Sequence, residues 1–380
     1  MKKTIILGAG ATYGSSTTRV DLPPPLLKDL PAIISDKFLS LNSSVDGPFF
    51  AKGFNQLLDL TNTRSDIEQY LTILHILGLI SKSINQKLVF MTDDEIEALL
   101  SSQYIESVFK DDQLAGKARR ILAFFHDNKN VALLNYPFNF QNLFQNSLRE
   151  YMYHALTSCF CIYHNKLFNE LETGDAVVNF NYDEIADYTL FSSNRLSKIS
   201  FMGLPFASIN LPREPSADCQ PMRYLKVHGS FNWLSQVEDF SVVHYNLISE
   251  ACNKNPVGNT FFPIILPTLT KEIIYKQYPI YKDHIEAFLS CISESDEIIL
   301  VGKSFMNSDR ELNELIQKER SSKKCMITIV DPLSLIHISE PTRLLSTSYA
   351  VFCLKKKKIT HNKAKDQFFT DRLTTSQTET

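Results

Sequence analysis

Three polar side chains in this sequence have types that can act on a bound ligand: an amide, a carboxylate and an imidazole. Asn181 and Asp183 follow the apolar run 176–180, and His228 follows the run 223–227. An amide donates and accepts hydrogen bonds, a carboxylate favours positive charge, and a neutral imidazole takes up a proton near pH 7. Structural roles also fit, because Asn and Asp are common in turns and a histidine can be a core residue.

Glycines follow two other apolar runs. The run 3–7 leads into Gly8 and Gly10, and the run 297–301 leads into Gly302. Because glycine has no Cβ atom, backbone N–H groups in such loops can approach a phosphate group closely. The next glycine after Gly10 comes one residue too late for the G-x-G-x-x-G dinucleotide fingerprint, and prolines follow, so a plain tight turn is the alternative.

The order of apolar runs predicts an α/β fold. A loop is expected at 8–14, and buried strands are expected at 3–7, 176–180, 198–203, 223–229, 240–245, 262–267, 297–301 and 326–330. Helical patterns lie between several of these runs, which predicts a Rossmann-like, doubly wound parallel sheet. Because parallel strands end at one edge of a sheet, we expect the polar residues and the glycine loops to line one cleft there.

Helical periodicity dominates the region 49–172 and predicts a helical insertion subdomain. The segment 65–80 has Ser65 or Asp66 as a cap, 92–109 begins with Thr92, and 139–171 predicts one or two long helices.

Four short motifs follow the predicted strands in a recognisable order: GAGAT at 8–12, NYD at 181–183, HGS at 228–230 and GKSF at 302–305. With them the chain resembles the sirtuin fold, and in particular the bacterial sirtuin-like NAD hydrolases of antiphage defence. The resemblance covers residues 1–332 and includes PTLTKE at 267–272 and IVDP at 329–332.

The resemblance implies hydrolysis of the nicotinamide–ribose bond of NAD to nicotinamide and ADP-ribose. Asn181 and Asp183 would face the nicotinamide ribose and the carboxamide, and His228 would act near the ribose hydroxyls. The first glycine loop would hold the pyrophosphate, the second would line the adenosine side, and the last strand would edge the adenine pocket. The residues so assigned to NAD binding are Gly8, Ala9, Gly10, Ala11, Thr12, Gly229, Gly302, Ser304 and Asp331.

The chain also departs from classical sirtuin deacylases. None of its seven cysteines forms a C-x-x-C pair, so no zinc is expected. Arg19 is the candidate for the arginine of the loop that follows the glycines in that family, and Trp233 fits either a cleft wall or the core. The alternatives are an NAD-dependent deacylase or ADP-ribosyl transferase, and a non-catalytic module that senses NAD or ADP-ribose.

Composition limits the partners and the compartment. The net charge of −3 over 380 residues argues against direct nucleic-acid binding, and no apolar run reaches transmembrane length. The scattered cysteines and the lack of a signal peptide predict a cytoplasmic protein. The helical insertion is the surface expected to bind a partner, either another copy of the chain or a DNA-translocating ATPase.

The last segment, 333–380, is expected to be non-native. Its stretches LSLIHISEPTR and SYAVFCLKKKK resemble an in-frame translation of a transposase-type sequencing adapter that runs into poly-A. The alternative is a natural strand followed by a basic linker.

Overall fold

A computed structural model provides the structure of the chain, and all structural statements below refer to the residues that it describes. These are residues 1–19, 21–25, 29–33, 36, 55–62, 66–83, 92, 94, 112–128, 145, 148–172, 174–192, 223–236, 242–244, 247–254, 260–261, 264–265, 268, 271, 279–303, 309, 313–314, 316 and 325–330.

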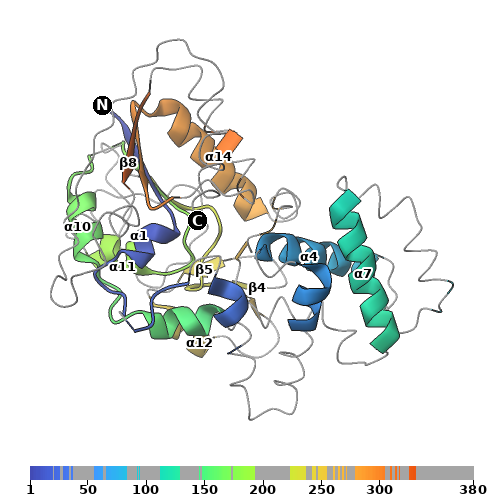
Figure 1. Ribbon diagram of the computed structural model, residues 1–380. Coiled ribbons are helices and arrows are strands. Elements are labelled where there is room, and N and C mark those ends of the chain that lie inside the picture. The colour runs from blue at the N-terminus through green and yellow to red at the C-terminus, as the bar shows by residue number, and fades with distance from the viewer. Residues whose placement is uncertain are drawn as a thin grey trace, which may run out of the picture.

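A five-stranded parallel sheet forms the centre of the fold (Figure 1). Its strands, in spatial order, are β3 (Arg223–Lys226), β2 (Ala176–Asn179), β1 (Lys3–Leu7), β7 (Glu297–Val301) and β8 (Met326–Val330). Every neighbouring pair runs parallel. The predicted α/β, Rossmann-like fold with a parallel sheet is therefore confirmed.

The strands are apolar because both faces of the sheet are covered. Ile5 and Val177 pack on one face with α10 (Ile162–Asn169) and α11 (Ile185–Ser192), whereas Ile6 and Val178 pack on the other face with α14 (Pro279–Glu294). Side chains alternate between the faces of a strand, so a strand buried on both sides reads as a continuous apolar run. Figure 1 shows α14 on one side of the sheet and α10 and α11 on the other.

The segment 8–14 differs from its prediction as a loop, because Ala9–Tyr13 forms the short helix α1. Gly8 is extended and precedes the helix, and the N–H group of Gly14 bonds to the carbonyl oxygen of Gly10 at 2.9 Å. The prolines that argued against a helix begin only at Pro23, beyond this single turn.

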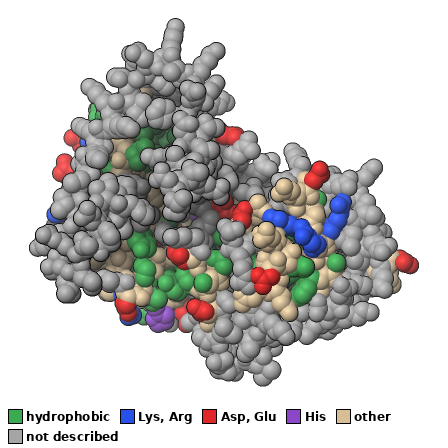
Figure 2. Space-filling model, viewed as in Figure 1, with side chains coloured by type: hydrophobic (Ala, Val, Ile, Leu, Met, Phe, Trp, Pro, Cys, Tyr) green, Lys and Arg blue, Asp and Glu red, His purple; other side chains and the backbone are tan. Residues whose placement is uncertain are grey.

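Two longer helices come from the region predicted as a helical insertion. α4 (Ile67–Ser83) and α7 (Asp112–Asn128) lie side by side in Figure 1, and the Asp66 carboxylate accepts a hydrogen bond from the N–H of Gln69 at 3.0 Å, as predicted for a helix cap. Figure 2 shows basic side chains gathered over these helices, and the sequence of α7 includes Lys117, Arg119 and Arg120.

The predicted helical stretch 139–171 contains two helical segments, 148–155 and α10, with a break between them. Of the predicted helix 92–109, only Thr92 and Asp94 belong to the described residues, so this helix stays a prediction. The division of the chain into a sheet domain and an insertion stays a prediction.

A second, antiparallel sheet was not anticipated. It contains β5 (Val242–His244), β4 (Trp233–Gln236) and β6 (Thr260–Phe261) in that order, and α12 (Ile248–Lys254) packs near β4. The expected strand at 240–245 thus exists in part but belongs to this sheet. The expected strand at 198–203 lies outside the described residues.

Within the described residues, no helix is long and apolar enough to cross a membrane. The segment 333–380 lies outside the described residues, so its non-native origin stays a prediction.

Candidate functional site

A cavity opens at the carboxyl edge of the parallel sheet, where ligands bind in folds of this class. The chain runs from β1 through β2 to β3 on one side of the sheet and returns to β7 on the other side of β1. This reversal leaves a crevice beside the end of β1. The cavity is open to solvent, and its volume is about 820 Å³ when the solvent-filled space at its opening is included.

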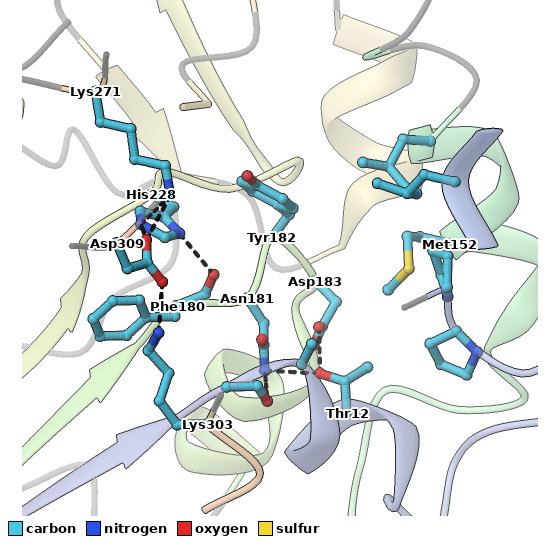
Figure 3. Close-up of a pocket in the computed structure, with 16 residues that line it drawn as sticks. Thr12, Met152, Phe180, Asn181, Tyr182, Asp183, His228, Lys271, Lys303 and Asp309 are labelled. Carbon is cyan, nitrogen blue, oxygen red and sulfur yellow. Dashed lines mark hydrogen bonds and ion pairs between the residues drawn. The ribbon is translucent and has the colours of Figure 1, made fainter. Parts of the chain in front are cut away.

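The predicted segments meet in this cavity. Gly8, Ala9 and Thr12 line it from the end of β1, Asn181 and Asp183 from the end of β2, and His228 from the end of β3. Figure 3 shows Asn181 and Asp183 in the middle of the cavity, with Thr12 and Met152 on one side of them and His228 on the other.

The glycines of the two loops pack against each other. A Cβ atom on Gly8 would lie 2.5 Å from the Cα of Lys303, and one on Gly10 would lie 2.9 Å from the Cα of Gly302. Gly302 has a φ of +55°, and a Cβ atom there would lie 2.3 Å from the nitrogen of Ala11. Close contact between the loops after β1 and β7 therefore requires glycine at these positions.

Most N–H groups of the first loop already have partners. Gly8 donates to the carbonyl of Val301 at 3.0 Å, Gly10 to that of Gly302 at 2.9 Å, and Ala11 to that of Gly8 at 2.8 Å. The N–H groups of Gly8 and Gly10, which were expected to hold a pyrophosphate, thus join the two loops in this structure. Gly10, Ala11 and Gly302 contribute to this packing and are not part of the cavity lining.

Asn181, Thr12 and Asp183 form a hydrogen-bonded chain at the floor of the cavity. The Asn181 amide donates to the carbonyl of Gly8 and to the Thr12 hydroxyl, both at 2.9 Å. Thr12 in turn donates to the Asp183 carboxylate at 2.6 Å, and the other carboxylate oxygen accepts from the N–H of Ile185 at 3.0 Å. All three side chains are buried, so their orientation is fixed from within the protein.

A buried polar network lies next to the hydrogen-bonded side chains of Asn181, Thr12 and Asp183 and fixes the backbone of Asn181 and Asp183. Asn179 accepts a hydrogen bond from the N–H of Asn181 at 2.9 Å and donates to the Tyr224 hydroxyl at 3.0 Å, which donates to Asp187. Lys226 bonds to the same Asp187 at 3.1 Å and to the carbonyl of Asp183. The charge of Lys226 is therefore paired, and it fixes the loop that carries the site.

His228 is buried, and both of its ring nitrogens have contacts. Nδ1 donates to the carbonyl of Phe180 at 3.2 Å, so the uncharged ring carries its proton there and leaves a lone pair on Nε2. Nε2 lies 3.3 Å from the Lys271 ammonium and 3.2 Å from the Asp309 carboxylate. Burial lowers the pKa of His228 to about 4. Lys271 adds to this effect and Asp309 opposes it, and the ring is neutral at pH 7.

Three charged residues of the cavity were missed by the sequence analysis: Lys271, Lys303 and Asp309. Asp309 accepts from Lys271 at 2.6 Å through Oδ1 and from Lys303 at 2.5 Å through Oδ2, and both lysine side chains are about 5% exposed. Lys303 also lies over the Phe180 ring, 4.4 Å from its centroid. Lys271 and Lys303 lie within motifs that carried the resemblance, which is the only signal that could have found them.

An apolar wall faces these charges across the cavity. It contains Pro24, Pro25, Leu30, Leu148 and Met152. These residues come from the segments that follow α1 and precede α10. The cavity is therefore apolar on one side and cationic on the other, with Asn181 and Asp183 between.

The remaining predicted residues lie elsewhere. Gly229 adopts a φ of +76° in the turn after β3 and pairs with Ile264, outside the cavity lining. Arg19 pairs with Asp21 at the surface. Trp233 is a core residue, 2% exposed, whose ring meets that of His284 edge-on at 5.8 Å. Ser304 and Asp331 lie outside the described residues.

Comparison with known proteins adds no assignment. No family model matches this chain, and no curated protein matches it.

Proposed function

We propose that the protein binds NAD in this cavity and hydrolyses its nicotinamide–ribose bond to nicotinamide and ADP-ribose. One observation carries the proposal: the Asn181–Thr12–Asp183 chain lies between an apolar wall and a cationic wall. A ligand that spans this cavity needs a flat apolar end, a polar centre and an anionic end. The nicotinamide, ribose and pyrophosphate groups of NAD follow one another in this order.

The charges support the same orientation. NAD carries a positive charge on the nicotinamide ring and negative charges on the pyrophosphate. Asp183 is the carboxylate beside the apolar wall, and Lys271 and Lys303 are on the opposite side. A bound dinucleotide with its ring at Met152 and its phosphates at the lysines places each charge near its opposite.

The chemistry needs stabilisation of positive charge on the ribose. As the bond breaks, the nicotinamide becomes neutral and the ribose gains oxocarbenium character. The Asp183 carboxylate, fixed by Thr12 and by the N–H of Ile185, stabilises that charge electrostatically. The Asn181 side chain donates through Nδ2 to Gly8 and Thr12, which leaves its Oδ1 to accept a hydrogen bond from a ribose hydroxyl or a water molecule.

His228 is neutral, as a base must be, but its Nε2 contacts Lys271. To take a proton from a hydroxyl group or a water molecule, Nε2 has to exchange this contact for one with the ligand. This requirement favours a second candidate function: the chain binds NAD or ADP-ribose as a sensor, without turnover.

Chromatography of NAD after incubation with the protein tests the proposal. We expect nicotinamide and ADP-ribose to appear with the unchanged chain and to be lost with Asn181→Ala. The matched control, Asn169→Ala, alters an exposed residue at the end of α10 and should retain activity. No NAD loss together with measurable NAD binding would favour the sensor, and transfer to an added acyl-peptide or protein acceptor would favour a deacylase or ADP-ribosyl transferase.

The biological role that goes with this reaction is depletion of cytoplasmic NAD in antiphage defence, supported by the resemblance of the sequence motifs. The proposed partners are a second copy of the chain or a DNA-translocating ATPase, bound through the region of α4 and α7. Infection of cells that express the unchanged chain or Asn181→Ala, with NAD measured over time, tests this role; equal NAD levels in both would exclude it.

A further inference from the structure

Lys271, Asp309 and Lys303 form a charged cluster of two cations and one anion, whereas a structural ion pair needs only one of each. One carboxylate bonds to two ammonium groups, at 2.6 and 2.5 Å. The neighbouring His228 is neutral at pH 7 and adds no charge. The three-residue cluster therefore carries one more positive than negative charge, although all its side chains are nearly inaccessible to water.

Burial of an excess charge is costly unless something compensates it. The environment bears out this cost, because burial lowers the pKa of Lys303 despite the opposing effect of Asp309. Burial alone would raise the pKa of the Asp309 carboxyl, yet the ammonium groups of Lys271 and Lys303 hold it well below its usual range. Glu68 of α4 is a second carboxylate that acts on Lys303, less than Asp309 does, and it offsets part of the excess positive charge of the cluster.

The cluster borders the cavity, so a ligand in the cavity lies beside it, although the three side chains expose only 4–5% of their surface. Lys271, Lys303 and Asp309 all line the cavity, and Figure 3 shows the two lysine chains approaching Asp309 from opposite directions. Lys271 donates to Asp309 and lies against His228, so at most two of its three N–H donors are engaged among the contacts described.

We infer that Lys271 and Lys303, held apart by Asp309, form a subsite for a phosphate group of the bound ligand. Ammonium groups beside a phosphate neutralise its charge with charge-assisted hydrogen bonds. The subsite replaces the first glycine loop as the main phosphate contact, because the N–H groups of Gly8 and Gly10 bond to Val301 and Gly302. Only the identity of the phosphate as the pyrophosphate of NAD rests on the proposed function.

Calorimetric titration with ADP-ribose, inorganic pyrophosphate and adenosine tests the subsite. We expect Lys271→Met and Lys303→Met to bind ADP-ribose and pyrophosphate at least about tenfold more weakly than the unchanged chain, with adenosine unaffected. Lys2→Met is the matched control, since Lys2 pairs with Glu294 at the opposite end of β1, and it should bind all three probes normally. Undiminished binding of ADP-ribose by both cavity variants, or no binding of either phosphorylated probe by the unchanged chain, overturns the inference.

Asp309→Asn tests the subsite in the opposite direction, because this variant should bind a phosphate group more tightly rather than more weakly. Without the carboxylate the two lysines lose their counter-charge, so pyrophosphate should bind more tightly and raise the melting temperature more than in the unchanged chain. A purely structural cluster would give no such gain, and the absence of a gain in a folded Asp309→Asn protein contradicts the subsite.

Salt dependence gives a test that needs no folded variant. Binding of ADP-ribose by the unchanged chain should weaken with added salt more steeply than binding of adenosine, because ions screen the phosphate contacts. Equal dependence would overturn the inference. If NAD is not hydrolysed but the lysine variants no longer bind ADP-ribose, the subsite stands and the proposed reaction fails. If NAD is hydrolysed but the variants bind ADP-ribose normally, the proposed reaction stands and the subsite fails.

Discussion

Thr12 joins the two polar residues at the centre of the site. Its hydroxyl accepts from Asn181 at 2.9 Å and donates to Asp183 at 2.6 Å, and the side chain is buried. Removal of the hydroxyl would leave the donor of Asn181 and the acceptor of Asp183 without this partner, which is costly in a buried site. The geometry of both ligand-facing residues thus depends on one small side chain.

We predict that Thr12→Val lowers kcat for NAD hydrolysis about tenfold or more, because Val has a similar shape but no hydroxyl. Thr12→Ser keeps the hydroxyl and should retain most of the activity. Steady-state kinetics of the two variants, with melting temperatures as a check on folding, measures the effect. Equal activity of the Val and Ser variants would show that the hydrogen-bonded chain does not matter.

Glu184, the neighbour of Asp183, makes the free energy of unfolding depend on pH. Burial raises the pKa of its carboxyl from 4.5 to about 7, because hydrogen bonds from its own backbone N–H, from the N–H of Ile248 and from the Cys159 thiol offset the effect of burial only in part. Between these two values the native state holds a proton that the unfolded state has lost, so the free energy of unfolding falls as pH rises from 4.5 to 7.

Glu184→Gln should remove this fall, because the amide does not titrate. We expect the variant to gain about 1 kcal/mol or more relative to the unchanged chain between pH 5 and pH 8, at roughly 1.4 kcal/mol per unit of pKa shift. Denaturant unfolding at the two pH values measures the gain. A constant difference between the two proteins would contradict the raised pKa.

At the scale of elements, the contact between the loops after β1 and β7 shapes the cavity. Gly302 adopts a left-handed φ of +55° and lies against the backbone of Gly10 and Ala11, where a Cβ atom would come within 2.3 Å. The carbonyl of Gly302 also accepts from the N–H of Gly10. The side chain of Lys303 is positioned by the same contact, because it follows Gly302 directly.

We predict that Gly302→Ala destabilises the protein by about 2 kcal/mol or more and weakens ligand binding, through backbone strain and the clash. The matched control is Gly116→Ala in α7, where a Cβ atom would meet nothing within 4 Å and helix propensity should add roughly 0.5–1 kcal/mol. Chemical denaturation compares the two. Similar changes in both variants would exclude tight packing at Gly302.

Local sequence patterns predicted the strands that are mainly apolar. β1, β2 and β7 are mainly apolar and are buried on both faces, and the polar residues that follow them could be placed at one sheet edge from topology alone. Lys271 and Asp309 could not be placed in this way, because they do not directly follow an apolar run: they come four and eight residues after the predicted strands 262–267 and 297–301. Their meeting depends on the tertiary path of the chain between β3 and the end of β7.

The roles of the glycines could not be read from sequence either. The same glycine pattern fits a loop that binds a phosphate and a loop that packs against a neighbouring loop. Only the position of Gly302 in the structure distinguishes these two roles. The second sheet was missed because β4 and β6 are only four and two residues long, too short for a clear period, and the predicted strand at 240–245, which contains β5, was assigned to the parallel sheet.

At the scale of the whole molecule, the parallel sheet gathers residues from both ends of the sequence. Thr12, His228 and Lys303 are more than 70 residues apart in sequence and line one cavity. The sheet ends in β8, an edge strand in the described fold, where Ile329 is 52% exposed. Among the described residues, none that lines the cavity comes from β8, and the segment 333–380 stays predicted to be non-native.

We therefore predict that a chain ending at Pro332 keeps its melting temperature and its NAD-binding affinity. Differential scanning calorimetry and calorimetric titration of the two chains measure this. A large loss of stability on truncation would show that 333–380 covers the sheet edge and would argue for a native segment. Sequencing of the source DNA across the codon of Leu333 checks the adapter origin independently.

We propose that one cavity holds a dinucleotide with its ribose at Asn181 and Asp183, and an experimental structure with bound ADP-ribose would test this placement. We expect the terminal ribose within hydrogen-bond distance of Asn181 or Asp183 and a phosphate against Lys271 and Lys303. ADP-ribose bound at another place, or bound here with its phosphates at the apolar wall of Pro24 and Met152, would contradict it.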